Sequence, residues 1–189
     1  MNNAHPSATG DRMADPTCAP ARPLALVGLM GVGKSTIGRR LAAALDRSFV
    51  DADEEIERAA NRSVSEIFAE HGEAYFRAGE RRVIARLMEE GHGVIATGGG
   101  AFVDDETRAL VLEQGIAIWL DCDLDTLVER TARKDTRPLL RNGDPRTILR
   151  DLKERRSPAY CQAHIHIVTD DGPHEQAVAR ILEELARWP

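Results

Sequence analysis

The stretch LALVGLMGVGKSTIGRRLAAAL, residues 24–45, decides the fold of this chain. It opens with an apolar run, passes through a glycine-rich segment and continues with apolar residues at helical spacing. Ile37, Leu41 and Leu45 recur at steps of four, which places them on one face of a helix. The stretch therefore predicts a buried strand, a tight turn and a helix over 36–45 in direct succession.

The glycine-rich segment GLMGVGKS, residues 28–35, matches the G-x-x-x-x-G-K-[ST] pattern of a phosphate-binding loop. Its glycines let the backbone turn so that successive N–H groups point inward. These glycines are Gly28, Gly31 and Gly33. Lys34 would place a point charge on the β- and γ-phosphates, and the Ser35 hydroxyl can ligate Mg²⁺. The motif predicts ATP or GTP as a ligand and leaves the reaction open.

Composition narrows the choice of reaction. The chain has 189 residues, enough for one domain and short for two, and 42% of them are hydrophobic. A net charge of −6 argues against a general nucleic-acid binder, and no apolar run is long enough to span a bilayer. The chain has no Asn-Lys-x-Asp segment for guanine recognition. A small phosphate-binding-loop protein of this kind suggests a kinase for a small acceptor.

The ends and the cysteines indicate a cytoplasmic protein. Residues 1–22 are rich in Ala, Pro and small polar residues without an apolar period, which predicts a disordered tail and not a secretory signal. Cys18, Cys122 and Cys161 are odd in number and far apart. They predict neither a disulfide framework nor a zinc site, and they fit a reducing compartment.

Five short apolar runs predict buried strands, separated by longer stretches with helical spacing. The runs are 24–28, 48–51, 93–97, 116–121 and 165–169. Strands that alternate with helices indicate a parallel sheet covered on both faces. Two helical stretches in a row, about 54–70 and 73–90, exceed a single crossover helix. We therefore expect an extra helical subdomain between the second and third strands.

Two aspartates follow the second predicted strand, in FVDADEEIE (49–57). Residues two apart in an extended chain point to the same side, and ligands bind at the carboxyl ends of parallel strands. One of Asp51 and Asp53 could hold Mg²⁺, and the other could accept the proton of an acceptor hydroxyl. The alternative is that Asp53 caps the next helix. The neighbouring phosphate-binding loop favours the functional interpretation.

The third predicted strand ends in three glycines, in GVIATGGGAF (93–102). Gly98, Gly99 and Gly100 leave backbone without side chains, which a ligand can approach closely. Many phosphate-binding-loop ATPases carry a magnesium-binding Asp near this strand end. Here Thr97 and the glycines occupy that place, so Asp51 is the better metal candidate.

Basic residues gather late in this acidic chain, with ten Lys or Arg and four Asp or Glu between Arg130 and Arg156. Within that region KDTRPLLRNGDP (134–145) has the Pro, Gly and Asn of a loop. A basic loop in a nucleotide-binding protein suggests a lid that excludes water and brings Arg137 to the transferring phosphate. Arg77 and Arg156 are further candidates, because arginine forks suit a carboxylate. The residues alone do not choose among these arginines.

Taken together, the motifs resemble the shikimate kinase family from about Leu24 to the last helix. The segments that carry the resemblance are GLMGVGKSTIGRRLA, DADEEIE, FRAGE, ATGGGAF, TRPLL and ERRSPAY. The phosphate-binding loop is shared by many families, whereas the combination of the other segments is far more specific. One departure is Ala159, where the family usually has Leu in R-x-P-L-Y.

The resemblance implies an α/β fold of the nucleoside-monophosphate-kinase type, with a five-stranded parallel sheet. It implies ATP-dependent phosphorylation of the 3-hydroxyl of shikimate, with Mg²⁺ as cofactor and a monomer as the working form. It also implies one kinase domain over 23–189, with a shikimate-binding subdomain at about 52–80 and a lid at about 131–146.

Site roles follow from the same resemblance. The implied nucleotide contacts are Gly31, Val32, Gly33, Lys34, Ser35, Thr36, Arg130, near the adenine, and Arg137. The implied shikimate contacts are Asp53 at the hydroxyls, Arg77 and Arg156 at the carboxylate, and Gly98, Gly99 and Gly100 at the ring. Lys34, Asp53 and Arg137 would be catalytic, and Ser35 and Asp51 would organise Mg²⁺. Two alternatives are a kinase for another small acid such as gluconate and a nucleotide-binding module without catalysis.

Overall fold

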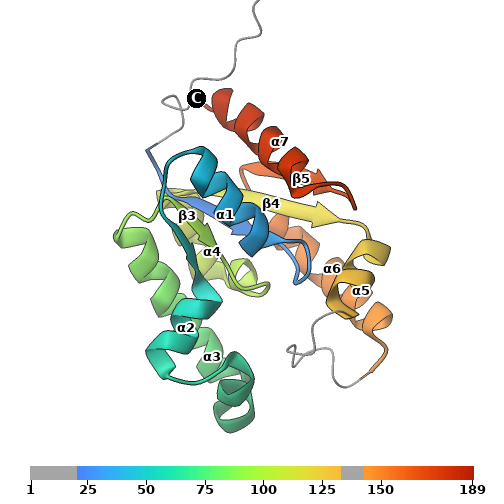
Figure 1. Cartoon of the computed structure of the whole chain (residues 1–189). Coiled ribbons are helices and arrows are strands. Elements are labelled where there is room, and N and C mark those ends of the chain that lie inside the picture. The colour runs from blue at the N-terminus through green and yellow to red at the C-terminus, as the bar shows by residue number, and fades with distance from the viewer. Residues whose placement is uncertain (1–20, 133–142) are drawn as a thin grey trace, which may run out of the picture.

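The computed structural model describes residues 21–132 and 143–189. It contains one five-stranded parallel sheet in the order β2-β3-β1-β4-β5 (Figure 1). The strands are β1 (Leu24–Val27), β2 (Phe49–Asp51), β3 (Val94–Ala96), β4 (Ile116–Cys122) and β5 (Ile165–Thr169). The predicted parallel sheet is confirmed, with ends that differ by a residue or two. Most of the predicted tail, 1–20, and most of the predicted lid, 133–142, lie outside the described residues.

The central strand is the one that precedes the glycine-rich loop. All four residues of β1 are buried, and Leu24 pairs with Val94 on one side and with Ile116 on the other. A fully apolar strand is expected where helices cover both faces of a parallel sheet. The loop after β1 therefore begins in the middle of the carboxyl edge of the sheet, where ligands bind in this class of fold.

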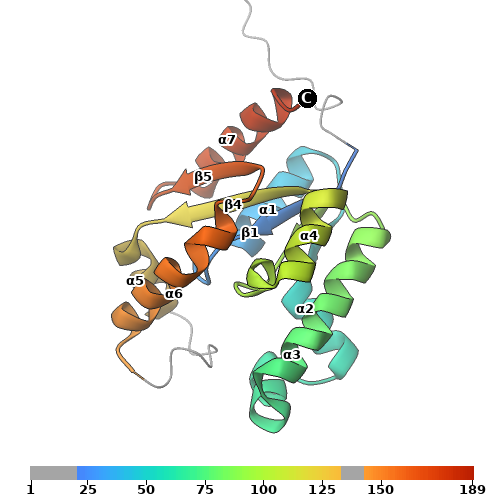
Figure 2. The same cartoon turned by 180° about the vertical axis from the view of Figure 1, so that it is seen from behind.

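Helices cover both faces of the sheet (Figures 1 and 2). One face carries α1 (Lys34–Ala44) and α7 (His174–Ala186), and the other carries α4 (Asp105–Gln114) and α6 (Pro145–Tyr160). Helix α5 (Leu124–Ala132) packs against α6, and a short 3₁₀ helix, η2 (Ala101–Val103), follows the three glycines. One apolar core runs through both layers.

The helical insert is confirmed, and so is a break between the two predicted stretches, at Gly72, but an earlier break at 61–63 was not predicted. Helix α2 (Ala52–Ala60) ends at Asn61 in a left-handed conformation, and Ser63 starts α3 (Val64–Glu89) with a capping box to Glu66. A further break inside α3 lies at Gly72, with φ 78° and ψ 175°. The Ser-x-x-Glu cap signal in the sequence identifies the first break, which helical periodicity alone did not.

The insert has a small apolar cluster of its own. Ile56 of α2 packs with Ile67 and Phe76 of α3, separately from the main core. The second half of α3 instead joins the main core through Ile84 and Leu87. Helix α3 thus links a small outer unit to the sheet.

The structure also bears on the predictions for the cysteines and for a membrane-spanning segment. Of the cysteines, Cys122 and Cys161 are free thiols, and burial raises the pKa of the Cys122 thiol to about 11. Cys18 lies outside the described residues. No helix within 21–132 and 143–189 is both long and apolar enough to cross a membrane.

A histidine at the edge of the sheet predicts a pH-dependent stability. Pairing of β4 with β5 begins at Ile118, and one residue earlier the Ala117 N–H donates to Nδ1 of His164 at 3.0 Å. That acceptor must be unprotonated, and burial together with Arg22 lowers the pKa of His164. The stabilisation by this hydrogen bond is therefore complete above the ordinary histidine pKa of about 6.5. It is lost as the pH falls through the lowered pKa of His164 in the folded protein.

We expect His164→Leu to reduce stability at pH 8 by about 1 kcal/mol, the net contribution of one hydrogen bond. Thermal unfolding of both proteins between pH 5 and pH 8 measures this, and the difference in Tm should shrink toward pH 5. His71→Leu, at an exposed histidine of α3, is the control. A difference in Tm that stays constant with pH would contradict the assigned hydrogen bond.

Candidate active site

The glycine-rich loop has the backbone geometry of a phosphate cradle. Gly28, Gly31 and Gly33 have φ values of 134°, 89° and 97°, which side chains rarely tolerate. A Cβ on Gly28 would also lie 2.3 Å from the carbonyl oxygen of Leu120. Helix α1 begins directly after the loop, so its unpaired N–H groups and positive end face the same space.

Lys34 is the first residue of α1, and its side chain folds back over the loop. Its Nζ donates to the carbonyl oxygens of Gly28 and Leu29, each at 2.9 Å. The ammonium group therefore lies inside the curve of the loop, where the phosphates of a nucleotide would bind. Of the other predicted nucleotide contacts, Val32 has a buried side chain and Thr36 is exposed.

Ser35, in the first turn of α1, meets Asp51, at the carboxyl end of β2. The Ser35 hydroxyl donates to Oδ2 of Asp51 at 2.5 Å. This pair supplies one hydroxyl and one carboxylate, both oxygen ligands. Mg²⁺ commonly takes one or two carboxylates and completes its shell with waters and substrate phosphates. The donor set therefore fits a magnesium ion held jointly with a nucleotide.

The relation of the two aspartates differs from the expectation. Helix α2 begins at Ala52, so the two residues do not alternate along an extended strand. Asp51 is the N-cap of α2, and its Oδ1 accepts the Asp53 N–H at 3.1 Å. The alternative that Asp53 caps this helix is wrong. Asp53 stands in the first turn of α2 with its carboxylate free for another role.

Burial, and next the charge of Asp51, raise the pKa of Asp53. Glu57 adds to this shift, whereas Lys34 and Arg77 oppose it, so the carboxyl lies among two acidic and two basic neighbours. A carboxyl group with a raised pKa beside a phosphate cradle suits acceptance of a proton from a substrate hydroxyl.

The three glycines after β3 lie against these charged groups. A Cβ on Gly98 would lie 2.8 Å from Oδ1 of Asp53, and one on Gly100 would lie 2.4 Å from Nη2 of Arg77. On Gly99 it would lie 3.4 Å from Nη1 of Arg156. The glycine loop is thus surrounded by the Asp53 carboxylate and by both arginines, the residues that the resemblance assigns to the acceptor.

A residue that the sequence reasoning missed, Glu80, anchors Arg77. Its Oε2 accepts a hydrogen bond from Nη1 of Arg77 at 2.6 Å, and Nη2 of Arg77 lies 3.2 Å from Glu73. Glu80 is only 2% exposed, its Oε1 has no hydrogen-bond partner among the described residues, and burial raises its pKa. The signal was present in FRAGE, where Glu80 follows Arg77 at i+3 on one helix face.

Arg156 approaches the glycine loop from α6. It is 8% exposed, and its Nη1 donates to the carbonyl oxygen of Gly99 at 2.8 Å. Within the described part of the chain it forms no ion pair with a carboxylate, although Glu80 lies close enough to feel its charge. A buried guanidinium without a paired carboxylate is suited to bind one from a ligand.

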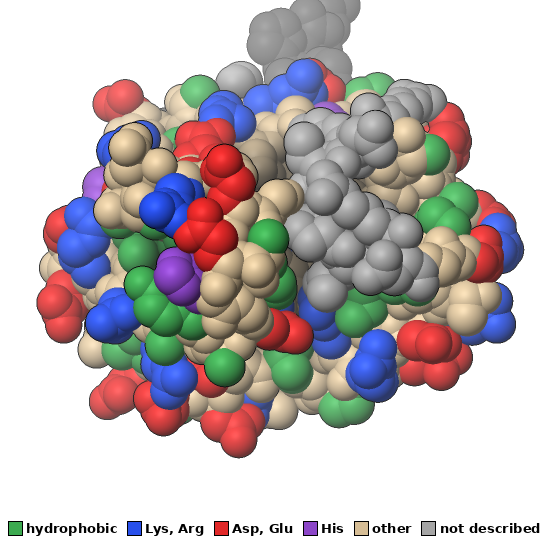
Figure 3. All heavy atoms as spheres, turned by 90° about the horizontal axis from the view of Figure 1, so that it is seen from below, with side chains coloured by type: hydrophobic (Ala, Val, Ile, Leu, Met, Phe, Trp, Pro, Cys, Tyr) green, Lys and Arg blue, Asp and Glu red, His purple; other side chains and the backbone are tan. Residues whose placement is uncertain are grey.

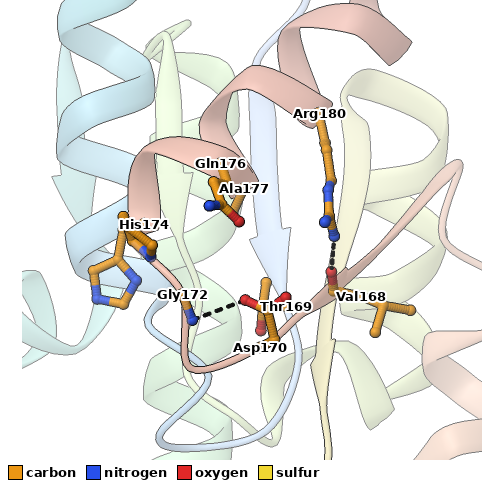
Figure 4. Close-up of a pocket in the computed structure, with 9 residues that line it drawn as sticks. Val168, Thr169, Asp170, Gly172, His174, Gln176, Ala177 and Arg180 are labelled. Carbon is orange, nitrogen blue, oxygen red and sulfur yellow. Dashed lines mark hydrogen bonds between the residues drawn. The ribbon is translucent and has the colours of Figure 1, made fainter.

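On the other side of the phosphate-binding loop, Arg130 joins α5 to the segment between β5 and α7. Its Nη2 donates to the carbonyl oxygen of Asp170 at 2.7 Å, and its buried Nη1 has no partner among the described residues. That segment forms a small hollow lined by Asp170, Gly172 and Gln176 (Figure 4). His174 points out of the hollow toward Gly33 of the phosphate-binding loop. Arg137 lies outside the described residues.

The site does not lie in a surface patch of a single charge sign. Figure 3 shows the molecule from the end at which α2 and α3 lie, and acidic and basic side chains are interspersed over this face. The described site therefore depends on particular pairs such as Arg77 with Glu80 and Ser35 with Asp51. The arrangement suits two small anionic ligands, one at the phosphate cradle and one at the glycine loop.

Comparison with known proteins identifies relatives over most of the chain. A family model described as shikimate kinase matches residues 30–186. A shikimate kinase of Novosphingobium aromaticivorans is 60% identical over 171 residues, covering 88% of this chain and 89% of that protein. A solved shikimate kinase from Acinetobacter baumannii, in complex with shikimate, is 38% identical with a TM-score of 0.85 and covers 88% of this chain and 93% of its own.

A more distant likeness bears on the alternative acceptor. A gluconokinase structure from Sinorhizobium meliloti 1021 matches with a TM-score of 0.61 at 17% identity, over 88% of this chain and 93% of that one. At that identity the match shows a shared fold and no more. Nearly all the residues described above lie within the range matched by the family model, and Gly28 and Leu29 immediately precede it.

Proposed function

The chain belongs to the shikimate kinase family, and we propose that it transfers the γ-phosphoryl group of ATP to the 3-hydroxyl of shikimate. The observation that carries the proposal is the position of the glycine loop. It lies between Asp53 and two arginines, beside the phosphate cradle. A hydroxy acid held there by its carboxylate would present a hydroxyl to the phosphates.

The nucleotide side is assigned to the loop and its neighbours. Lys34 would stabilise the charge that develops on the transferring phosphoryl group, and the N–H groups of 31–36 would hold the phosphates. Arg130 would lie at the adenine, and Arg137 would reach the phosphates from the lid. Ser35 and Asp51 would hold Mg²⁺, which supplies positive charge that neutralises the phosphates.

The acceptor side is assigned to Asp53, the glycine loop and two arginines. Arg77 and Arg156 would bind the shikimate carboxylate, and Gly98–Gly100 would contact its ring. Asp53 would accept the hydrogen bond of the 3-hydroxyl and then its proton, while that oxygen bonds to phosphorus and ADP leaves. Desolvation of the Asp53 carboxyl supports this assignment, because it keeps water from competing as acceptor.

The parts of the domain follow from these assignments. We propose one kinase domain over 23–189, in which about 52–80 form the shikimate-binding subdomain. The separate apolar cluster of α2 and α3 supports that division. The lid at about 131–146 falls largely outside the described residues. We also propose a cytoplasmic monomer, consistent with the two free thiols, and light scattering of the purified protein tests the monomer.

ADP release with Mg-ATP tests the function, with shikimate, gluconate and AMP as parallel acceptors. We expect release with shikimate alone. Release with gluconate or AMP in place of shikimate would refute the proposal and favour a kinase for another acceptor. Absence of release with all three would favour a nucleotide-binding module without catalysis.

Arg77→Ala is expected to raise the KM for shikimate, because it removes one partner of a desolvated charge pair. Such a loss typically costs about 2–5 kcal/mol, which is at least a factor of ten in affinity. Steady-state kinetics with each substrate varied in turn measures the effect. The KM for ATP should change little, since Arg77 lies on the acceptor side.

Arg81→Ala is the matched control, because Arg81 is on the same helix and forms a surface ion pair with Glu106. It should leave both KM values unchanged. Equal shikimate kinetics in Arg77→Ala and the wild type would refute the carboxylate assignment.

A further inference from the structure

The carbonyl oxygen of Gly99 accepts two hydrogen bonds from α6. One comes from Nη1 of Arg156 at 2.8 Å, and the other comes from the hydroxyl of Tyr160. A carbonyl oxygen has two lone pairs, so both donors are satisfied together. Arg156 and Tyr160 stand four residues apart, on the same face of the helix. The central glycine of the loop is thereby tied to the carboxylate-binding arginine and to a tyrosine.

Tyr160 is a fixed donor. Its side chain is 1% exposed, and its ring packs against Trp119 with the centroids 5.9 Å apart. Burial raises the pKa of the Tyr160 hydroxyl to about 12, so it carries its proton across the physiological range. The hydroxyl has a single hydrogen, which it donates to the carbonyl oxygen of Gly99, and Arg156 lies within hydrogen-bonding reach of its oxygen.

The guanidinium of Arg156 has a second proposed partner besides the carbonyl oxygen of Gly99. On the proposed function, its N–H groups turn to the carboxylate of the acceptor, and a bidentate pair uses two of them. Any shift away from Gly99 removes a hydrogen bond from a partly buried carbonyl, and an unpaired buried acceptor is unfavourable. A second donor on the same oxygen removes that conflict.

We propose that Tyr160 is a positioning residue for acceptor binding. Its hydroxyl keeps the Gly99 carbonyl paired and in place when Arg156 engages the substrate carboxylate. Tyr160 touches neither substrate in this account; it acts through Gly99 and Arg156. The inference rests on the proposed function and adds a residue to it that no carboxylate or phosphate contact would identify.

Tyr160→Phe tests the proposal, because it removes one oxygen and retains the ring. We expect the KM for shikimate to rise about tenfold, the effect of leaving one buried acceptor unpaired. The kcat and the KM for ATP should stay within about twofold of the wild type. Calorimetric titration of shikimate into the full-length protein should show the same loss of affinity.

Two controls separate positioning from general destabilisation. Tyr75→Phe makes the same chemical change at an exposed position, and Thr107→Val removes a buried hydroxyl that bonds to Asp104. Neither should change the KM for shikimate, even where Thr107→Val lowers the Tm as much as Tyr160→Phe does.

An unchanged KM for shikimate in Tyr160→Phe overturns the inference, and so does a parallel rise in both KM values. Failure of Tyr160→Phe to fold also overturns it, because the hydroxyl would then be a general structural requirement. A wild type that does not phosphorylate shikimate overturns the proposed function and this inference with it. An active wild type with an unaffected variant overturns the inference alone.

Discussion

Replacing Lys34 by alanine is expected to lower kcat by on the order of 10²- to 10³-fold, the usual loss when one preorganised donor to a transition-state charge is removed. The reason lies in the position of Nζ, which is held 2.9 Å from two carbonyl oxygens inside the curve of the phosphate-binding loop. Without this ammonium group, no other described side chain offers a positive charge from that position. ADP release under saturating substrates measures the effect.

The fold should survive this change. Lys34 stands at the beginning of α1, and the helix is anchored to the core by Ile37 and Leu41 further along. Lys153→Ala is the control, because Lys153 binds Asp121 and the carbonyl of Cys122 and makes no described contact with the phosphate-binding loop. Near-normal turnover in Lys34→Ala, with normal ATP affinity, would remove Lys34 from the catalytic group.

Asp53→Asn is expected to lower kcat by about 10²-fold or more, the typical contribution of a positioned general base. The amide keeps the shape of the carboxylate and can still accept a hydrogen bond, but it does not take a proton. Asp51 and not Asp53 caps α2, so the helix should remain folded. Rapid mixing of the variant with ATP and shikimate measures the chemical step.

The stability of this variant has a predicted sign. The raised pKa of Asp53 means that its ionised form is disfavoured in the folded protein. Removing the charge should therefore leave the Tm unchanged or raise it at neutral pH. Asp105→Asn, at an exposed aspartate of α4, is the control and should affect neither kcat nor Tm appreciably. A melted Asp53→Asn protein would assign the residue a structural role.

The pH dependence follows from the same shift. A base must be deprotonated to act, so activity is present above the pKa of Asp53 and is lost as the pH falls through it. Because that pKa is raised, the acid limb of kcat/KM should lie at higher pH than for an exposed aspartate. The limb should be absent in Asp53→Asn. A limb that persists in the variant would belong to another group, and Glu80, also with a raised pKa, is the nearest candidate.

Sequence alone determined the features that depend on short stretches of chain. The phosphate-binding loop follows from a strand, three glycines with positive φ and a helix start, all within a few residues of one another. The strands were readable for a similar reason, since each is a short apolar run in a parallel sheet. The edge strand β5 differs from the prediction of a buried strand, because only its alternate residues are buried. Local backbone geometry and burial patterns depend on residues that are close together in the sequence, so no distant contact is needed to predict them.

Only the tertiary structure decided how the charged groups pair. It joined Ser35 to Asp51, desolvated the i, i+3 pair of Arg77 and Glu80, and brought Arg156 and Tyr160 from α6 to the carbonyl of Gly99. Which arginine is desolvated and which stays in solvent depends on the packing of elements far apart in sequence. Periodicity and motif spacing carry no information on that packing. The backbone geometry of the phosphate-binding loop was therefore predictable, whereas the hydrogen-bond network around Gly99 was not.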